Sequence, residues 1–281
     1  MKVTIFGTRG TSPVTRPEFA KYGGETTSAL VEGDGGDKIA LDAGTGIRML
    51  ETRLEKTEAS SLLILMTHYH LDHVMGLPSF QHLYDANFTI TIAAPRRNTY
   101  TAEEVVPRIM EQPFWPRQIG NVQATVKFLT LEGETSKRPL RRGALEIRWC
   151  PLHHPGGCSA YRIDDTSSGA AVVFATDVEW GLSNPAEKEA FRRLCAEPAF
   201  PGLLIFDGQF SAKNYSDFRG WGHSTWEDAV EAARGARARR LIVTHHDPES
   251  DDQLLDGVAA ELGSMMPEAE LARGGMEVQV T

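Results

Sequence analysis

Four side chains able to bind a metal ion lie within six positions of the chain, in the segment HYHLDH (68–73). They are His68, His70, Asp72 and His73. The segment follows the apolar run LLILMT (62–67), which is typical of a buried strand. So many polar side chains have little packing rationale there, because each would need a buried hydrogen-bonding partner. Imidazole nitrogen and carboxylate oxygen suit zinc, iron or manganese, so the segment predicts a metal site.

Three further apolar runs end in residues of the same types. His153 and His154 follow IRWCPL (147–152), Asp177 follows AVVFAT (171–176), and His245, His246 and Asp247 follow RLIVT (240–244). Loops at one edge of a rigid sheet are where sites are usually assembled. His68 and His70 can face one ion from an extended segment, while Asp72 and His73 follow a turn and can face a second. Because a carboxylate has two oxygens, Asp177 can bridge two cations.

The elements that must position these residues are mostly short strands. Runs rich in Val, Ile, Leu, Phe and Thr predict strands at 2–6, 28–33, 38–44, 62–68, 88–95, 124–131, 145–152, 159–164, 170–177, 202–208 and 240–247. Helical periodicity predicts helices at 46–58, 225–238 and 250–265. Ser224 is expected to cap the second of these helices, with Glu227 completing a capping box. This order predicts two sheets with helices on their outer faces, in a single domain over 1–281.

The segment 96–121 stands apart from this pattern. It holds three prolines, Phe114 and Trp115, and its periodicity is weak. Two interpretations remain open, a flap over the site and a surface excursion with a small core of its own.

Composition limits the classes of function. The chain has 281 residues and a formal net charge of −9, and a negative surface disfavours a long nucleic-acid footprint. Three cysteines are too few for a disulfide framework. No signal-peptide pattern or apolar run of membrane-spanning length is visible in the sequence. We therefore expect a cytoplasmic enzyme with no membrane partner.

The segment THYHLDH (67–73), followed by GLP (76–78), resembles the HxHxDH signature of the metallo-β-lactamase superfamily. The resemblance covers nearly the whole chain, and it implies an α/β fold, the four-layer αββα sandwich, with a dinuclear site at one edge. It implies one ion held by His68, His70 and His154, a second held by Asp72, His73 and His245, and Asp177 as the bridge. His153 and His246 stay open as alternatives to their neighbours. His154 is preferred because it precedes Pro155, and His245 because it follows Thr244 directly.

Four further stretches are similar to the ribonuclease Z-like phosphodiesterase branch of that superfamily. They are GTRGTSP (7–13), YGGETTS (22–28), LDAGTGIR (41–48) and GHST (222–225). In that branch the histidine of the last motif, here His223, pairs with an acid at the end of the preceding strand. That acid would be Asp207, where the branch usually carries Glu. The resemblance thus implies that His223 and Asp207 take part in catalysis together with Asp72.

The expected reaction is hydrolysis of a phosphodiester by a hydroxide that bridges two divalent ions, zinc by default and manganese or iron otherwise. Because the chain is acidic and has no long basic arm, we expect a small phosphodiester such as a cyclic nucleotide. Candidate substrate contacts are Arg9, Tyr69, Phe114, Trp115 and His246. The alternatives are a carboxyl-ester, lactone or thioester hydrolase, a tRNA 3′-end endonuclease, and a non-catalytic ligand-sensing metal protein. Relatives in the family are often dimers, so a homodimer is possible.

Overall fold

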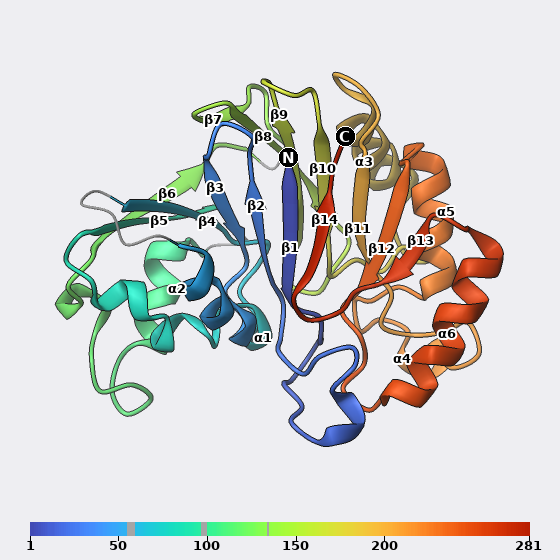
Figure 1. Ribbon diagram of the computed structural model, residues 1–281, viewed down its shortest axis with the longest axis horizontal. Helices are drawn as coiled ribbons and strands as arrows, with labels where there is room; N and C mark the ends of the chain where they lie inside the picture. Colours follow the sequence, from blue (N-terminus) through green and yellow to red (C-terminus); the bar gives the residue numbers. More distant parts are fainter. Residues whose placement is uncertain (55–59, 97–99, 134) are drawn as a thin grey trace.

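Two mixed β-sheets lie face to face in the computed structural model, which describes residues 1–54, 60–96, 100–133 and 135–281 (Figure 1). Within those ranges each sheet has seven strands. The first sheet has the order β14 (Met276–Gln279), β1 (Lys2–Gly7), β2 (Ser28–Glu32), β3 (Lys38–Leu41), β4 (Ser60–Leu65), β5 (Phe88–Pro95) and β6 (Thr125–Leu131). The second has the order β13 (Ala269–Leu271), β12 (Arg240–Thr244), β11 (Leu203–Asp207), β10 (Ala171–Ala175), β9 (Cys158–Asp165), β8 (Leu145–Leu152) and β7 (Leu140–Arg142).

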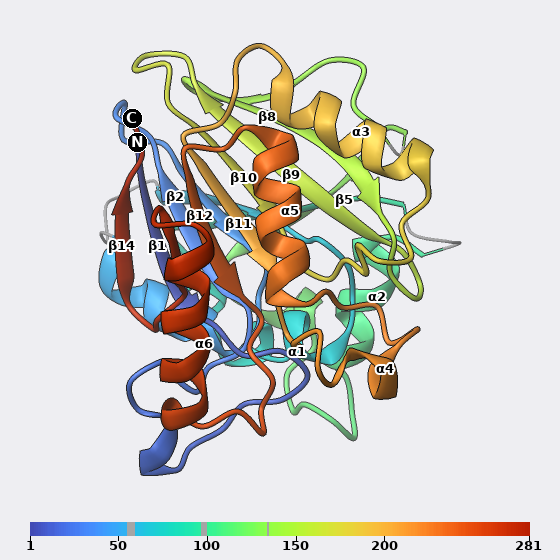
Figure 2. The same cartoon turned by 90° about the vertical axis from the view of Figure 1, so that its right-hand side faces the viewer.

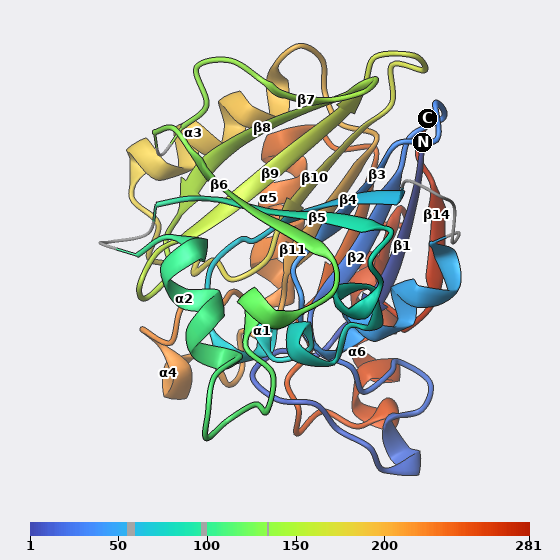
Figure 3. The same cartoon turned by 90° about the vertical axis from the view of Figure 1, so that its left-hand side faces the viewer.

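Helices cover the outer face of each sheet. The helices are α1 (Leu71–Val74), α2 (Ala102–Ile109), α3 (Pro185–Ala196), α4 (Tyr215–Phe218), α5 (Trp226–Ala236) and α6 (Asp252–Met265). Helices α3, α5 and α6 cover the second sheet, whereas α1 and α2 lie on the side of the first (Figures 2 and 3). Short 3-10 helices complete the set at Pro17–Phe19, Thr45–Arg53, Leu77–Ser79, Gln81–Tyr84 and Ile119–Asn121. The predicted four-layer αββα sandwich is therefore confirmed.

Three apolar layers hold the sandwich together. The central layer lies between the sheets, where Val3 and Ile5 of β1 are buried in the same cluster as Ile147 of β8 and Ile163 of β9. Phe6, the next residue of β1, points the other way and joins the outer layer of the first sheet. Because both faces of such strands are buried, they carry nearly continuous apolar runs. Each buried side chain stabilises the fold by about 1.5–3 kcal/mol relative to an exposed one.

Strand direction brings the polar strand ends to one edge of the sandwich. Strands β10, β11 and β12 are parallel. Strand β9 is antiparallel to both β8 and β10, so β8 runs in the same direction as that group. In the first sheet β3, β4 and β5 are parallel to one another. The carboxyl ends of β4, β8, β10, β11 and β12 therefore open toward the edge where α1 and α4 lie (Figure 1).

Several local predictions from the sequence were wrong. The helix expected at 46–58 is a 3-10 helix over Thr45–Arg53, and the remainder of that range from 55 on lies outside the described residues. This element starts under close packing, because a Cβ at Gly46 would lie 2.7 Å from the Gly7 nitrogen. The predicted strand bounds at 170–177 and 240–247 were too long, since both strands end before the polar residues. Strands β7, β13 and β14 were not predicted at all.

The predicted cap of α5 was also wrong. Thr225 is the N-cap and forms the capping box with Asp228. Ser224 is unavailable because its hydroxyl donates to the Val178 carbonyl and its backbone nitrogen donates to Asp207. Glu227 accepts hydrogen bonds from the Ala212 nitrogen instead. Ser224 thus ties the helix start to the polar edge.

The segment 96–121 packs on the first sheet and shares its outer apolar layer, and 97–99 within it lie outside the described residues. Its helix α2 buries Ala102 and Val106, and Met110 after the helix is also buried, all in the outer layer of the first sheet. A role as a flap stays a prediction. Across the described parts of the chain, no helix is both long and apolar enough to span a membrane.

Candidate metal centre

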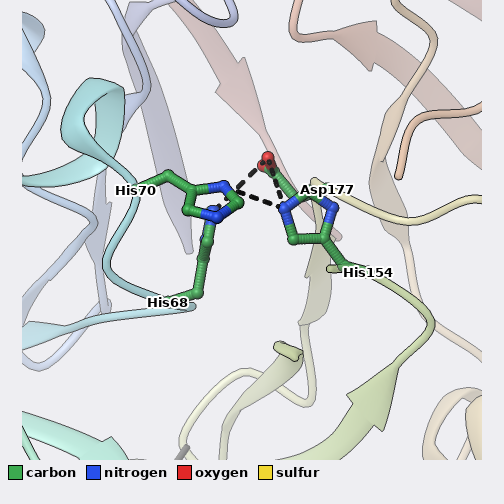
Figure 4. Close-up of side chains that lie close together, drawn as sticks. All are labelled: His68, His70, His154 and Asp177. Atoms are coloured by element: carbon green, nitrogen blue, oxygen red, sulfur yellow. Dashed lines mark hydrogen bonds and ion pairs between the residues drawn. The ribbon is translucent and has the colours of Figure 1, made fainter. Parts of the chain in front are cut away.

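Seven side chains of metal-binding type converge at the polar edge. One cluster joins His68, His70, His154 and Asp177, and a second joins Asp72, His73, Asp177 and His245. In each cluster the nitrogen and oxygen atoms that could bind an ion lie within 4.8 Å of one another. Figure 4 shows the first cluster, in which the rings of His68, His70 and His154 and the carboxylate of Asp177 face a common point. Asp177 belongs to both clusters, as its two oxygens allow.

The first sheet supplies four of these residues from one short segment. The chain leaves β4 after Leu65, and His70 precedes α1 with an extended backbone (φ −63°, ψ 153°). The single turn of α1 then carries Asp72 and His73, both buried. Closely spaced ligands thus point to two places because the backbone changes from extended to helical between them.

The second sheet supplies one residue from each of three strand ends. His154 follows β8, Asp177 follows β10 and His245 follows β12. Asp177 and His245 have left-handed backbones, with φ of 60° and 65°. Such a conformation costs about 1–3 kcal/mol in a non-glycine residue and is commonly retained at functional sites. Here it turns each side chain back over the sheet edge.

Each of four histidines uses its Nδ1 atom for an orienting contact. Nδ1 of His73 lies 2.8 Å from Oδ2 of Asp42, and Nδ1 of His154 lies 2.9 Å from the Gly222 carbonyl. Nδ1 of His245 lies 3.0 Å from Oε1 of Gln209. Nδ1 of His68 lies 3.1 Å from the Thr67 hydroxyl. Fixing Nδ1 in this way leaves Nε2 for the centre, which is the usual arrangement for histidines that bind metals.

The remaining nitrogen atoms fit a bound cation. Nε2 of His68, His73 and His245 is buried and has no aligned hydrogen bond to any described residue. Oδ2 of Asp177 shares this property and lies 3.1 Å from Nε2 of His73. Buried polar atoms without partners are costly, and several of them facing one point is the pattern expected of a metal site. Five imidazoles and two carboxylates form a donor set for divalent ions.

The electrostatics of the cluster also favour a cation. Burial lowers the pKa of His68 well below its usual range and the pKa of His154 to about 4, so both rings are neutral at pH 7. Burial opposes ionisation of Asp177, but the surrounding histidines outweigh it and hold its pKa well below the ordinary value. Burial likewise opposes protonation of His245, yet Asp177 and Asp72 raise its pKa to about 9. The centre thus combines the neutral rings of His68 and His154 with carboxylates that attract positive charge.

The loop at 7–13 closes the centre on the side of the second cluster. The Thr11 backbone nitrogen donates to Oδ2 of Asp72 at 2.8 Å. A Cβ at Gly10 would lie 2.3 Å from ring atoms of His245, so only glycine fits there. The glycine-rich sequence is therefore a packing requirement of the centre.

A third group lies beside the two clusters, where Asp207, His223 and His245 meet. Nδ1 of His223 lies 2.9 Å from Oδ2 of Asp207. The fully buried Asp207 also accepts hydrogen bonds from the backbone nitrogens of Asp177 and Ser224. The His223 ring stacks on the His245 ring with centroids 4.7 Å apart. Asp207, although shorter than the glutamate usual in the branch, therefore reaches His223. It also joins the end of β11 to the end of β10 through the Asp177 nitrogen.

A sequence profile described as the Beta-lactamase superfamily domain matches residues 37–246. The chain belongs to this family. Ribonuclease Z of Haloarcula marismortui is 25% identical over 100% of this chain and 97% of its own length. The metallo-β-lactamase fold protein YhfI of Bacillus subtilis superposes with a TM-score of 0.70 at 21% identity, covering 99% of this chain and 98% of its own. A diphosphatase of the PhnP family superposes with a TM-score of 0.68 at 17% identity, covering 99% and 97%.

These similarities confirm the predicted family and its ribonuclease Z-like branch. The family and the branch are those of metal-dependent hydrolases. In agreement with this, the two clusters supply residues able to bind divalent ions. The assignment of each ligand to an ion stays a prediction. Of the two histidine pairs left open by the sequence, the structure brings His154 and His245 into the clusters.

The neighbouring histidines, His153 and His246, belong to neither cluster. His153 is partly exposed, and its Nδ1 lies 3.3 Å from a carboxylate oxygen of Glu187. His246 is buried, and its Nε2 lies 2.9 Å from the Ala272 carbonyl. Burial lowers the pKa of His246 to about 4, which keeps its ring neutral. His246 therefore braces the loop after β12 and is turned away from the space over the clusters.

Arg9, a predicted substrate contact, is fully buried. Its guanidinium donates to the carbonyls of Gly23, Asp247 and Ser250 at 2.7–3.0 Å. These bonds join the loop after β1 to the segment that follows the ligand loop of β12. In this conformation Arg9 offers no surface to a substrate, and its geometry is that of a structural clamp.

The predicted aromatic contacts lie on the side of the first sheet. Phe114 is 76% exposed, and the Trp115 indole nitrogen donates to the Tyr84 hydroxyl at 3.0 Å. Tyr69 is half-buried and packs against the outer layer of that sheet. Their role in substrate binding stays a prediction.

Sequence reasoning missed three residues that support the centre. Asp42 orients His73, Gln209 orients His245, and Glu179 binds the loop that carries His223. Asp42 could have been found, because it follows an apolar strand in the same way as Asp177. Gln209 and Glu179 carry no comparable pattern, since each acts through a turn whose shape only the fold fixes.

Proposed function

We propose that this chain is a phosphodiesterase that hydrolyses a small phosphodiester, such as a cyclic nucleotide, at a dinuclear metal centre. The observation that carries the proposal is the pairing of His223 with Asp207 beside the two clusters. A metal-dependent ester or lactone hydrolase needs the clusters but has no need of this additional histidine. In the resembling phosphodiesterase branch this histidine stands beside the metals, where it could supply a proton to the alkoxide that leaves phosphorus.

The orientation of His223 suits that role. Asp207 accepts from Nδ1, so the hydrogen-bonded pair leaves Nε2 as the atom that can face a substrate. The ring is nearly buried and is held between His245 and Phe210. A fixed ring loses little entropy on binding, so its Nε2–H can donate to the leaving oxygen or to a phosphoryl oxygen.

The ligand set proposed for the two ions follows the two clusters. His68, His70 and His154 would hold one ion, Asp72, His73 and His245 the other, and Asp177 both. Divalent ions in these places supply Lewis acidity and bring the pKa of bound water near neutrality. Asp72 is the proposed proton acceptor, and because the Thr11 nitrogen donates to its Oδ2, its Oδ1 is the oxygen left for the proton. Zinc is the proposed metal, since the donors are imidazoles and carboxylates, and manganese or iron also suit them.

Exchange of His223 for alanine tests the proposal. We expect His223→Ala to lower turnover of a cyclic nucleotide, whose leaving group is an alkoxide, at least about tenfold while metal content stays constant. His153→Ala is the matched control, because that histidine lies in the adjacent loop but pairs with Glu187. Elemental analysis and parallel assays of a diester, a cyclic nucleotide and a lactone give the measurement. Retained cyclic-nucleotide turnover in His223→Ala, with the lactone as the better substrate, would overturn the proposal in favour of an ester or lactone hydrolase.

A second candidate is cleavage of RNA at a tRNA 3′ end. It is favoured by the full-length similarity to proteins named ribonuclease Z. The net charge of −9 argues for the smaller substrate, because each phosphate contact of a long RNA needs a cationic partner. A precursor tRNA with a 3′ trailer decides between them. Efficient, salt-sensitive trailer removal at rates above those for cyclic nucleotides would favour the RNA substrate.

Other sequence predictions stand beside this proposal. A single domain over 1–281, a homodimer and a cytoplasmic location remain predictions for sedimentation and fractionation experiments. A non-catalytic sensing role is distinguished by the same assays, because a metal-loaded protein that binds a nucleotide and turns over neither diesters nor esters would be a sensor.

A further inference from the structure

A buried carboxylate fixes the turn that precedes the proposed catalytic histidine. Glu179 is only 1% exposed and accepts from the backbone nitrogens of Gly220 at 2.7 Å and Gly222 at 2.8 Å. The Tyr215 hydroxyl donates to the same carboxylate at 2.6 Å. Both glycines have positive φ, at 89° and 94°, which a glycine adopts without strain. The turn therefore has one well-defined shape.

Trp221 lies between the two clamped glycines and is 60% exposed. Its backbone nitrogen donates to the Phe218 carbonyl at 3.0 Å. Because the nitrogens on both sides bind Glu179 in the interior, the indole projects outward. A single exposed aromatic residue is ordinary on a protein surface. This one differs because its backbone is held on both sides and it stands two positions from His223.

A row of rings connects Trp221 with the proposed catalytic histidine. The Trp221 ring packs edge-on against Phe218, with centroids 5.5 Å apart. Phe218 stacks on Phe210 at 4.3 Å with an interplanar angle of 4°. Phe210 packs edge-on against His223 at 6.2 Å. The indole thus has apolar support from Phe218, is largely exposed, and is connected to His223 by this row of rings.

We propose that Trp221 is a stacking platform that gives this site its preference for phosphodiesters carrying a nucleobase. An aromatic face held before binding loses little entropy when a base stacks on it. Base–aromatic stacking tolerates different bases, because every base has a flat π face. The inference rests on the proposed function, with the phosphodiester at the metal clusters and its base on the indole. The predicted substrate contacts Tyr69, Phe114 and Trp115 stay predictions beside it.

The test compares two esters that share a leaving group. Thymidine 5′-(p-nitrophenyl phosphate) carries a base, whereas methyl p-nitrophenyl phosphate does not, and both release p-nitrophenolate. The measured quantity is the ratio of kcat/KM for the thymidine ester to kcat/KM for the methyl ester. We expect Trp221→Ala and Trp221→Leu to lower this ratio at least about fivefold, the lower end for base–aromatic stacking, and Trp221→Phe to retain most of it. The leucine variant keeps an apolar side chain and removes only the ring.

Phe200→Ala is the matched control. Phe200 is also an exposed aromatic residue, at 45%, but it precedes β11 and so lies at the opposite edge of the sheet. We expect this variant to leave the ratio unchanged. A ratio that is unchanged in Trp221→Ala, or that falls equally in Phe200→Ala, overturns the proposal.

A binding measurement separates this inference from the proposed function. Calorimetry of the metal-loaded protein with AMP and with ribose 5-phosphate compares two monoesters that differ in the base. We expect tighter binding of AMP in the unmodified protein and loss of that preference in Trp221→Ala. If neither p-nitrophenyl ester is hydrolysed, the proposed function fails and the calorimetric preference alone judges Trp221. An unmodified protein that binds both monoesters equally overturns the inference even where diester turnover is present.

Discussion

The two sheets contribute to the metal centre in different ways. The first sheet supplies His68, His70, Asp72 and His73 from one continuous segment after β4. The second sheet supplies His154, Asp177 and His245 from three strand ends, spread over about a third of the chain. The first half of the centre is therefore organised largely by local backbone conformation. The second half exists only because parallel strands end at one edge.

The orienting contacts follow the same division. In the first half, Asp42 is fully buried and accepts from the Thr67 nitrogen and hydroxyl as well as contacting His73. In the second half, the partners are a loop carbonyl, Gly222, and the half-buried side chain of Gln209. Where the partner is buried, water cannot replace it. The comparison predicts that replacing an orienting residue lowers metal affinity and turnover more in the first half than in the second.

The largest effect is expected at Asp177, the one residue that both clusters share among the described residues. Its Oδ1 lies 3.6 Å from Nε2 of His68 in the first cluster, and its Oδ2 lies 3.1 Å from Nε2 of His73 in the second. Asp177→Ala should release metal from both halves and reduce diester turnover by more than about 100-fold, the upper end for changes outside the ligand set. Elemental analysis and turnover measure this, and full metal content in the variant would contradict the bridging role.

A smaller effect is expected for Asp42→Asn. The amide nitrogen cannot accept from Nδ1 of His73, so the ring would carry its proton on Nε2, the atom that faces the centre. We expect a loss of about 10–100-fold in metal affinity or turnover, measured by competition with a chelator. Asp34→Asn, an exposed change at the opposite end of the same sheet, is the control. Equal metal affinity and equal turnover in the two variants would show that the orientation of His73 does not depend on Asp42.

Gln209→Ala is the matching change in the second half, and we expect it to cost about tenfold or less. Oε1 of Gln209 contacts His245, while its amide nitrogen donates to the Thr11 hydroxyl at 3.3 Å. Because the side chain is partly exposed, water can replace the lost oxygen. The same chelator competition provides the measurement. A loss as large as that of Asp42→Asn would erase the difference proposed between the two halves.

The smallest effect on turnover is expected for Arg9→Lys, which acts on the junction between the two sheets. The lysine cannot reproduce the planar set of bonds to Gly23, Asp247 and Ser250. We expect the free energy of unfolding to fall by about 2 kcal/mol or more, with KM for the diester within about twofold at low temperature. Denaturant unfolding and steady-state kinetics measure these two quantities. A raised KM with unchanged stability would restore Arg9 as a substrate contact.

Features that depend on neighbouring residues could be predicted from the sequence, whereas features that depend on contacts between distant parts of the chain could not. The compact group at 68–73 and the apolar strands before the polar residues were visible, because hydrophobic periodicity and residue type are local properties. The choice of His154 and His245 over their neighbours followed from a family resemblance. The 3-10 helix at Thr45–Arg53 and the true cap of α5 were missed, because close packing against Gly7 and the use of Ser224 at the centre overrode local preference. Trp221 was missed because only the Glu179 clamp distinguishes it from an ordinary exposed aromatic residue.

The sequence by itself determined the chemistry of this protein, since imidazoles and carboxylates at the ends of buried strands have few uses other than binding a cation. The tertiary structure alone decided how each side chain is aimed. It set the left-handed turns at Asp177 and His245, the Nδ1 partners that expose each Nε2, and the burial of Arg9. The physical reason is that residue type fixes which bonds a group can form, whereas direction and solvent access depend on neighbours far away in the chain.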